Sequence, residues 1–178
     1  MSNKNRKIFN YDNIDESKIV SMLSKNELFD KSISATGILF YKIVKNNVKL
    51  MLIKYADKNW PKLDDFGGRI DNTDDTVFDA AIRETEEETN KIITKDLILK
   101  ISSDDNIKCF YNKTSKYFLH LIRVDEDFFS DTSIFGDFEE HDKIYRKVEW
   151  YDFKDCKTEL SYRLQMHELF NFIIKVEN

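Results

Sequence analysis

The chain has 178 residues, of which 41% are hydrophobic and 34% charged, and its formal net charge is −5. This profile predicts a soluble globular protein with a buried core and excludes an intrinsically disordered chain. The acidic balance argues against a broad nucleic-acid-binding face. The two cysteines, Cys109 and Cys156, are too few for a disulfide framework or a zinc cluster. Because the N-terminus is polar and no apolar run reaches membrane-spanning length, we expect a cytoplasmic protein with no membrane partner.

Apolar periodicity and turn residues predict the elements in chain order. They are a helix over Ser17–Phe29, strands over Ile33–Val44, Val48–Tyr55 and Phe66–Ile70, a helix over Thr76–Thr89, strands over Ile107–Tyr111, Lys116–Val124 and Lys143–Tyr151, and a helix over Leu160–Val176. The Lys45–Asn47 turn suits a hairpin, because Asn tolerates a positive φ. This order predicts an α/β (α+β) sandwich with a mixed sheet. We expect a single domain over residues 1–178, with an N-terminal helical extension over about residues 1–32.

The helix over Thr76–Thr89 carries the strongest functional signal, four glutamates within five positions. At about 100° per residue, Glu84, Glu87 and Glu88 share one face. A buried stripe is expected beside them at Ala81, Ile82, Thr85 and Thr89. Charge runs are usually solvated faces, but such faces interleave both signs, whereas this one carries a single sign. Carboxylates beside a backbone carbonyl of the preceding Gly-Gly pair instead suit a hard cation such as Mg²⁺ or Mn²⁺.

The stretch Gly68–Lys91, GRIDNTDDTVFDAAIRETEEETNK, resembles the Nudix box, G-x5-E-x7-R-E-U-x-E-E-x-G-U. The R-E-U-x-E-E part falls on residues 83–88. Counting back from there, the earlier glutamate of the family falls on Asp75, so the loop from Gly68 to Asp75 is one residue longer than in the family. Asn90 stands where the family has its closing glycine, and Asn is the next-best residue for a left-handed helix end.

The resemblance implies a Nudix-type α/β/α sandwich that hydrolyses a diphosphate linked to another group. It implies Mg²⁺ or Mn²⁺ as cofactor, with Glu84, Glu87, Glu88 and the carbonyl of Gly68, or alternatively of Gly67, as ligands. The cation would reverse the local charge and admit an anionic diphosphate. Arg83 would orient and neutralise the glutamates, the alternative being a plain surface salt bridge.

The general base varies within the Nudix family, and two locations are open in this chain. One is Glu84. The other is the later segment FGDFEEHDK, where we favour Glu139 or Glu140, since an ionised glutamate there would take a proton from water. The alternative for this segment is a solvated acidic loop, and His141 is interpreted as a surface histidine. The predicted catalytic residues are therefore Glu84, Arg83, Glu139 and Glu140.

Substrate residues are predicted from their positions around the glycines. Arg69 directly follows them and is expected to contact a phosphate, while Trp60 and Phe66 are expected to stack on a base. The expected substrate is a nucleoside diphosphate derivative, and a small nucleotide is favoured because the chain is short, acidic and without a second domain to hold RNA. The alternatives are capped RNA in a decapping reaction, a diphosphoinositol polyphosphate, and a non-catalytic domain that binds a nucleotide or a partner. A homodimer is also open.

Overall fold

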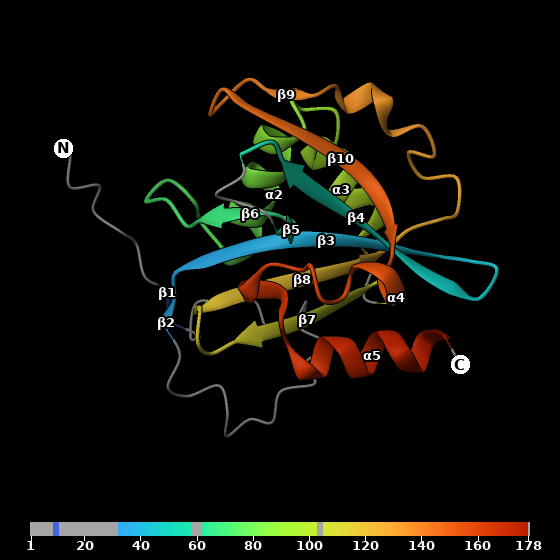
Figure 1. The fold of residues 1–178 in the computed structure, drawn as a ribbon. Helices are drawn as coiled ribbons and strands as arrows, with labels where there is room; N and C mark the ends of the chain where they lie inside the picture. The colour runs from blue at the N-terminus through green and yellow to red at the C-terminus, as the bar shows by residue number, and fades with distance from the viewer. Residues whose placement is uncertain (1–8, 11–31, 58–61, 103–104, 178) are drawn as a thin grey trace.

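The computed structural model describes residues 9–10, 32–57, 62–102 and 105–177 (Figure 1). The strands are β1 (Phe9–Asn10), β2 (Ser32–Ile33), β3 (Ala35–Val44), β4 (Asn47–Tyr55), β5 (Leu63–Asp64), β6 (Phe66–Arg69), β7 (Ile107–Asn112), β8 (Tyr117–Arg123), β9 (Phe138–Glu139) and β10 (Ile144–Asp152). The helices are α2 (Val77–Glu88), α3 (Lys95–Ile101), α4 (Phe153–Cys156) and α5 (His167–Glu177), with 3-10 turns η3 (Thr132–Phe135) and η4 (Tyr162–Leu164). The predicted helix over residues 17–29 and the predicted stacking residue Trp60 lie outside the described residues.

One mixed sheet organises the fold, as predicted. Its order is β7-β8-β3-β4-β10-β9, with β6 added to β3 and β5 added to β4. All of these pairings are antiparallel except that of β3 with β8. The predicted β3–β4 hairpin is confirmed, and its two-residue turn places Lys45 and Asn46 at φ values of 50° and 63°. Two successive positive φ values match the twist of the flanking strands.

Side chains of the central strands alternate between two cores, one on each face of the sheet. In β4, Met51 and Ile53 pack into the core that contains the buried residues of α2 and α3. Their neighbours Leu50 and Leu52 pack into the other core, with α4 and α5. Figure 1 shows α2 and α3 on one side of the sheet and α5 on the other. The predicted α/β/α sandwich is therefore confirmed.

The C-terminal helix begins at His167 and not at Leu160 as the periodicity predicts. Leu160 instead forms a parallel bridge with Leu63, and the Ser161 N–H donates to the Leu63 carbonyl at 2.8 Å. These backbone contacts replace the first two helical turns by an extended segment and the turn η4. Helix α3 is absent from the sequence prediction, although Thr94 marks its start by accepting a hydrogen bond from the Leu97 N–H.

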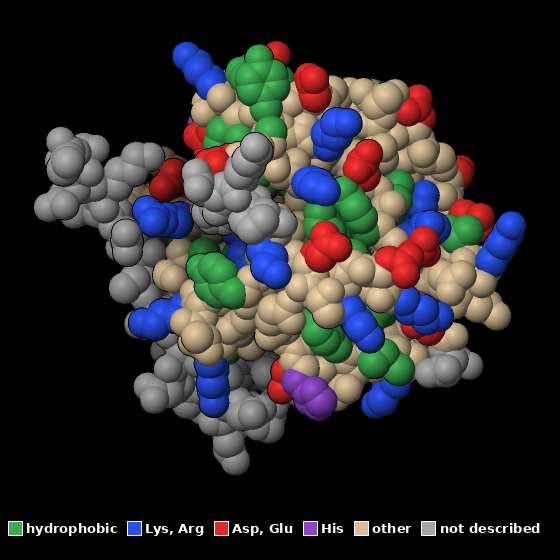
Figure 2. Space-filling view, viewed as in Figure 1, with side chains coloured by type: hydrophobic (Ala, Val, Ile, Leu, Met, Phe, Trp, Pro, Cys, Tyr) green, Lys and Arg blue, Asp and Glu red, His purple; other side chains and the backbone are tan. Residues whose placement is uncertain are grey.

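The surface is mixed in charge and has no large apolar patch on the face that Figure 2 presents. Acidic and basic side chains are interspersed there, with small hydrophobic groups between them. Among the described residues, the exposed large hydrophobic side chains come from five different elements and are those of Leu99, Ile134, Tyr145, Tyr162 and Ile174. None of the described helices is both long enough and apolar enough to cross a membrane.

Two glycines allow β3 and β6 to approach closely around a buried hydroxyl. Gly37 of β3 stands opposite Gly67 of β6. The Tyr117 hydroxyl lies against both glycines and donates to Asp65 Oδ2 at 2.7 Å. A Cβ at either glycine would overlap that hydroxyl. The glycines thus fix the position of β6, which borders the cavity described below.

Gly37→Ala tests this close approach. The added Cβ would lie 2.5 Å from the Phe66 carbonyl oxygen and 2.6 Å from Asp65 Oδ2. We expect the free energy of unfolding, measured by urea denaturation, to fall by about 1–3 kcal/mol because of this overpacking. Lys157→Ala, at an exposed position, is the control and should change it by less than about 0.5 kcal/mol. Equal denaturation midpoints for the two variants would contradict the close approach.

Candidate active site

A cavity of about 490 Å³ opens between α2, β6, the end of β4 and the loop after β9. Its described lining consists of Tyr55, Asp57, Asp64, Gly67, Gly68, Arg69, Asp71, Arg83, Glu84, Glu87, Glu88, His141, Asp142, Ile144 and Arg163. Seven of these side chains are carboxylates and three are guanidinium groups. The cavity thus brings together all three glutamates that the sequence predicts as metal ligands.

Helix α2 is anchored at its start and along its buried side. The Thr76 hydroxyl caps the helix by accepting from the Asp79 N–H at 3.0 Å. The predicted stripe of Ala81, Ile82, Thr85 and Thr89 is buried against the sheet. The Thr85 hydroxyl donates to the Ala81 carbonyl at 2.8 Å, so its burial leaves no unpaired polar atom. This packing holds the glutamate face of α2 towards the cavity.

Arg83 uses every guanidinium nitrogen to hold the carboxylates in place. Its Nη1 donates to Glu84 Oε1 at 2.9 Å and to Glu87 Oε2 at 3.0 Å. Its Nε and Nη2 donate to the two oxygens of Asp74, both at 3.0 Å, which is the bidentate geometry of a strong pair. Burial alone would lower the pKa of Arg83, but its hydrogen bond to Asp74 and the charge of Glu84 raise it above its usual value. Arg83 is therefore charged and lies where the predicted orienting role requires.

The acidic partner of Arg83 is Asp74 and not Asp75, on which the family's earlier glutamate was predicted to fall. Asp74 is 5% exposed and also accepts from the Asp71 N–H at 2.7 Å, whereas Asp75 is exposed. Asp74 lies six positions after Gly68, which is the G-x5-E spacing of the box. The additional residue therefore falls between Asp74 and Arg83, at the entry to α2, and not in the loop before it.

Glu88 is a half-buried carboxylate whose hydrogen-bond partners among the described residues are polar groups and include no cation. Its Oε1 accepts from the Tyr55 hydroxyl at 2.8 Å and its Oε2 accepts from the Gly67 N–H at 2.7 Å. Burial raises the pKa of Glu88 well above its usual value, although the charge of Arg163 opposes the shift. Burial likewise raises the pKa of Glu84, with Arg83 opposing it. For both carboxylates the effect of burial on the pKa outweighs that of the neighbouring arginine.

The backbone of β6 turns the carbonyl of Gly67, and not that of Gly68, towards α2. In an extended strand the N–H and C=O of one residue point to the same side. The Gly67 N–H donates to Glu88, and the Arg69 carbonyl, two residues later, accepts from Arg83 at 2.9 Å. Gly68 has the opposite orientation, towards β3. Of the two carbonyls that the sequence left open, that of Gly67 is the better placed.

The donor atoms at this site fit a hard divalent cation in kind. They are the carboxylates of Glu84, Glu87 and Glu88 and a backbone carbonyl, and such oxygens are the ligands that Mg²⁺ and Mn²⁺ prefer. Within the described residues, however, no three acidic, His or Cys side chains form a ready coordination cluster. Glu84 and Glu87 are turned towards Arg83, so these carboxylates would have to reorient to share a cation.

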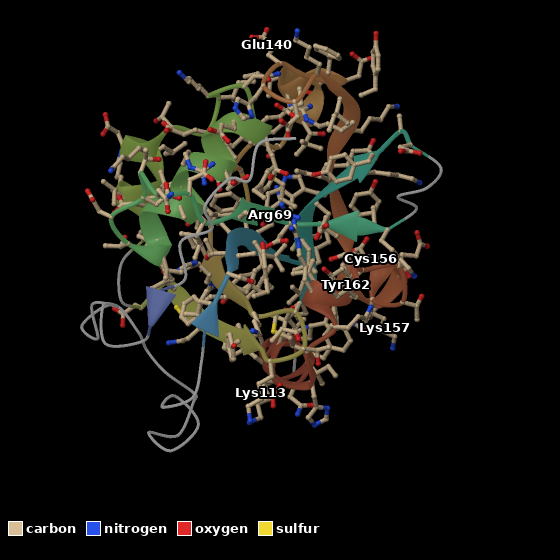
Figure 3. All side chains as sticks on the ribbon, turned by 90° about the vertical axis from the view of Figure 1, so that its left-hand side faces the viewer. Arg69, Lys113, Glu140, Cys156, Lys157 and Tyr162 are labelled. Carbon is tan, nitrogen blue, oxygen red and sulfur yellow. The ribbon has the colours of Figure 1, made fainter. Side chains whose placement is uncertain are left out.

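The late loop meets the cavity through residues other than the two predicted glutamates. Glu139 is 4% exposed, and its Oε1 accepts from the Asp142 N–H at 2.9 Å. Glu140 is exposed, and Figure 3 shows it at the top of the molecule, well separated from Arg69. Neither glutamate lines the cavity, whereas His141 and Asp142 do. His141 is an exposed histidine, as interpreted from the sequence, and its Nδ1 lies 3.6 Å from Glu87 Oε2.

The predicted substrate residues differ in their positions. Arg69 is exposed and lines the cavity. Its contact with a substrate phosphate stays a prediction. Phe66 is fully buried in the core beneath α2, so it presents no ring face to a nucleobase. The stacking role predicted for Phe66 is therefore wrong in this arrangement. Its side chain packs in the hydrophobic core and so anchors β6, which contains the two glycines that follow.

Two lining residues, Tyr55 and Arg163, were not assigned from the sequence. Tyr55 is the last residue of β4, and its hydroxyl contacts Glu88. Arg163 belongs to the segment that the periodicity assigned to the last helix. Arg163 lies instead in the turn η4, which follows the bridge between Leu160 and Leu63 of β5. No local pattern marks either residue, since a distant strand pairing brings each of them to the site.

Asn90 joins the end of α2 to the late loop. Its φ of 52° is the left-handed conformation that the closing glycine of the box would provide. Its side chain also donates to the Phe138 carbonyl at 2.8 Å and accepts from the Glu140 N–H at 2.9 Å. A glycine would provide the backbone conformation but neither hydrogen bond. Asn90 thus ties the segment that carries His141 to the helix that carries the glutamates.

A family model described as NUDIX domain matches residues 35–170 of the chain. No match is found among curated protein sequences. Among solved structures, an Ap4A hydrolase from C. elegans in a binary complex has a TM-score of 0.51 and 18% sequence identity, and the match covers 81% of this chain and 97% of that chain. That structure shares the fold described above.

Two further structures are similar at lower scores. The NUDIX domain of Shewanella oneidensis NrtR complexed with ADP ribose has a TM-score of 0.45 and 11% identity, covering 90% of this chain and 99% of that chain. A bifunctional NMN adenylyltransferase/ADP ribose pyrophosphatase from Francisella tularensis has a TM-score of 0.47 and 13% identity, covering 82% of this chain and 42% of that chain.

Asn90→Gly tests the connection between α2 and the late loop. Glycine retains the left-handed backbone but removes both side-chain hydrogen bonds, so we expect the free energy of unfolding to fall by about 1–2 kcal/mol. Amide hydrogen exchange should rise at Glu140, whose N–H loses its acceptor. The matched control is Asn171→Gly, away from the cavity on α5, which should leave exchange at Glu140 unchanged. Unaltered exchange at Glu140 in Asn90→Gly would show that the connection is unimportant.

Proposed function

The chain belongs to the Nudix domain family and is a Nudix hydrolase, and from this premise we propose that it hydrolyses the diphosphate linkage of a small nucleotide derivative with Mg²⁺ or Mn²⁺. One observation carries the proposal: Glu84, Glu87 and Glu88 face a single cavity, which Gly67 and Gly68 also line. Burial disfavours the charged forms of Glu84 and Glu88 by raising the pKa of each. A divalent cation would provide that charge.

The residues around the cation would divide the work of binding and orientation. Glu84, Glu87 and Glu88 would hold it together with the Gly67 carbonyl, and once bound it would polarise a phosphoryl oxygen and help to ionise water. Arg83 positions Glu84 and Glu87 through Nη1. Tyr55 and the Gly67 N–H would keep Glu88 in one orientation, as second contacts do for many metal ligands.

The general base is assigned by position. Glu84 lines the cavity and remains one choice. On the late loop, Glu139 and Glu140 were the predicted bases, but Asp142 is the carboxylate of that loop that borders the cavity. A base must lie within hydrogen-bond reach of the water that it deprotonates. We therefore assign the contribution of this loop to Asp142 in preference to Glu139 and Glu140.

The size and charge of the cavity support a small nucleotide. A volume of about 490 Å³ falls within the range of about 300–1,000 Å³ typical of small-molecule sites. The described lining holds seven carboxylates against three arginines, which does not suit the dense negative charge of a diphosphoinositol polyphosphate. On the part of the surface that Figure 2 shows in colour, acidic and basic side chains are interspersed. A compact substrate fits these features better than the alternatives.

Turnover of a diphosphate panel with Mn²⁺ or Mg²⁺ tests the proposal. The panel contains a deoxynucleoside triphosphate, ADP-ribose, a dinucleotide polyphosphate and a capped RNA oligonucleotide, and released mononucleotide or phosphate is measured. We expect turnover of at least one small nucleotide, abolished by EDTA. Faster turnover of capped RNA than of every small nucleotide would contradict the substrate class. No turnover on any compound would favour a binding domain that does not cleave.

Glu88→Gln tests the cation site directly. We expect kcat to fall about 100-fold or more, because the variant loses a charged oxygen ligand while the fold is retained. The matched control is Glu86→Gln on the same helix, since Glu86 accepts from the Lys95 N–H and does not line the cavity. Its kcat should stay within about twofold of wild type. Wild-type rates for Glu88→Gln would show that the cation site is wrongly assigned.

Asp142→Asn tests the base on the late loop. If Asp142 accepts a proton from water, the kcat of Asp142→Asn should be about 100-fold below that of the wild type, whereas Glu140→Gln should leave kcat unchanged. Both side chains are exposed on one loop, so their effects on folding should be equally small. The reverse result, a large loss only in Glu140→Gln, would restore the base predicted from the sequence. Wild-type rates in both variants would leave Glu84 as the base.

A further inference from the structure

The three arginines of the cavity differ in how many of their guanidinium nitrogens donate to a protein acceptor. Arg83 directs all three guanidinium nitrogens to carboxylates and a backbone carbonyl, so it has no nitrogen without a partner for a ligand. Arg69 is exposed and lines the cavity. It is labelled near the middle of the view in Figure 3. Arg163 lines the cavity although its side chain is only 14% exposed. Its side chain is the least exposed of the three.

Arg163 is held in place by groups on its inner side. Its Nε donates to Asp64 Oδ1 at 2.7 Å and to Asp65 Oδ1 at 3.0 Å, and its Nη2 donates to the Asp65 carbonyl at 3.2 Å. Its guanidinium carbon lies 4.8 Å from the centre of the Tyr117 ring. The Ser161 hydroxyl donates to Asp64 at 2.7 Å. Asp64 and Asp65 are almost completely buried, so the orientation of the guanidinium is fixed before any ligand arrives.

The remaining nitrogen of Arg163 is open to solvent. No hydrogen bond of Nη1 occurs with any residue that the structure describes. Within that same set of residues, the one buried side-chain polar atom without a partner is Ser115 Oγ. Nη1 is therefore accessible, and the cavity is the open space that Arg163 lines. A fixed guanidinium with an unused donor thus lines the same cavity as the three glutamates of α2.

We propose that Arg163 is a substrate-binding residue that donates from Nη1 to a non-bridging phosphoryl oxygen of the diphosphate. The inference rests on the function proposed above and adds a residue to it. Carboxylates outnumber cations in the lining, so an anionic substrate needs every positive contact that is available. Because Arg163 is oriented in advance, little side-chain entropy is lost on binding.

A purely structural role for Arg163 is the competing explanation, since its charge also compensates Asp64 and Asp65. Burial raises the pKa of Asp65 to about 7 although Arg163 opposes the shift. Removing Arg163 alone would therefore leave two buried carboxylates poorly compensated and would destabilise the fold. The test must separate this loss of stability from a loss of substrate contact.

The experiment measures binding of α,β-methylene-ADP in the presence of Mn²⁺ by calorimetry, with thermal unfolding of each variant in parallel. The variants are Arg163→Met, Arg163→Lys, and Arg163→Met combined with Asp65→Asn, which neutralises one of the two buried carboxylates. Arg123→Met is the control, because Arg123 is exposed on β8 and does not line the cavity. KM and kcat are measured on whichever compound of the diphosphate panel the wild type hydrolyses.

We expect Arg163→Met to weaken binding at least about tenfold and to raise KM by a similar factor, with a smaller change in kcat. Arg163→Lys retains the charge but not the planar guanidinium with its several N–H donors, and it should bind the analogue less tightly than wild type does. The double variant should regain thermal stability and still bind weakly. If the double variant binds within twofold of wild type, the inference is overturned while the proposed function stays intact. If neither Met variant folds, binding within twofold of wild type in Arg163→Lys has the same meaning. A wild type that neither binds nor hydrolyses any diphosphate would overturn both.

Discussion

Mutual repulsion among three glutamates on one face of α2 is the constraint on which the rest of the site depends. Glu84, Glu87 and Glu88 occupy i, i+3 and i+4 positions, where like charges destabilise a helix. Arg83 offsets part of this repulsion by pairing with Glu84 and Glu87 at about 3 Å. Glu88 has no such partner among the described residues and relies on the Tyr55 hydroxyl and the Gly67 N–H. The imbalance that remains is suited to a divalent cation.

The sheet supplies the rigidity that holds this charged face in place. Gly37 and Gly67 let β3 and β6 close around the Tyr117 hydroxyl, and the Gly67 N–H then meets Glu88. The main chain of the same residue is held by the buried Arg146, which donates to the Glu88 carbonyl at 2.8 Å and to the Phe135 carbonyl at 3.0 Å. The C-terminal end of the glutamate face is thereby fixed to β-structure through both the side chain and the carbonyl of Glu88. Such support is what keeps a catalytic constellation in one geometry.

The features predicted correctly from sequence are those that depend on local periodicity. The apolar runs predict the β3–β4 hairpin, and the helical wheel of α2 separates Ala81 and Thr85 from the glutamates. Features that depend on distant pairing could not be predicted. Leu160 begins no helix because it bridges Leu63, and this bridge is what brings Arg163 to the cavity. The partner of Arg83 depends on which of two adjacent aspartates is buried. Counting back from Arg83 along the motif gives Asp75, whereas the buried partner is Asp74.

The account's central claim is that a divalent cation completes the glutamate face of α2. Thermal unfolding of the wild type during titration with MnCl₂, against NaCl of equal ionic strength, tests that claim most directly. A cation that binds the folded state alone must raise the melting temperature in a saturable manner. The account predicts such a rise for the wild type and a clearly smaller one for Glu87→Gln. A melting temperature that responds equally to MnCl₂ and NaCl would contradict it.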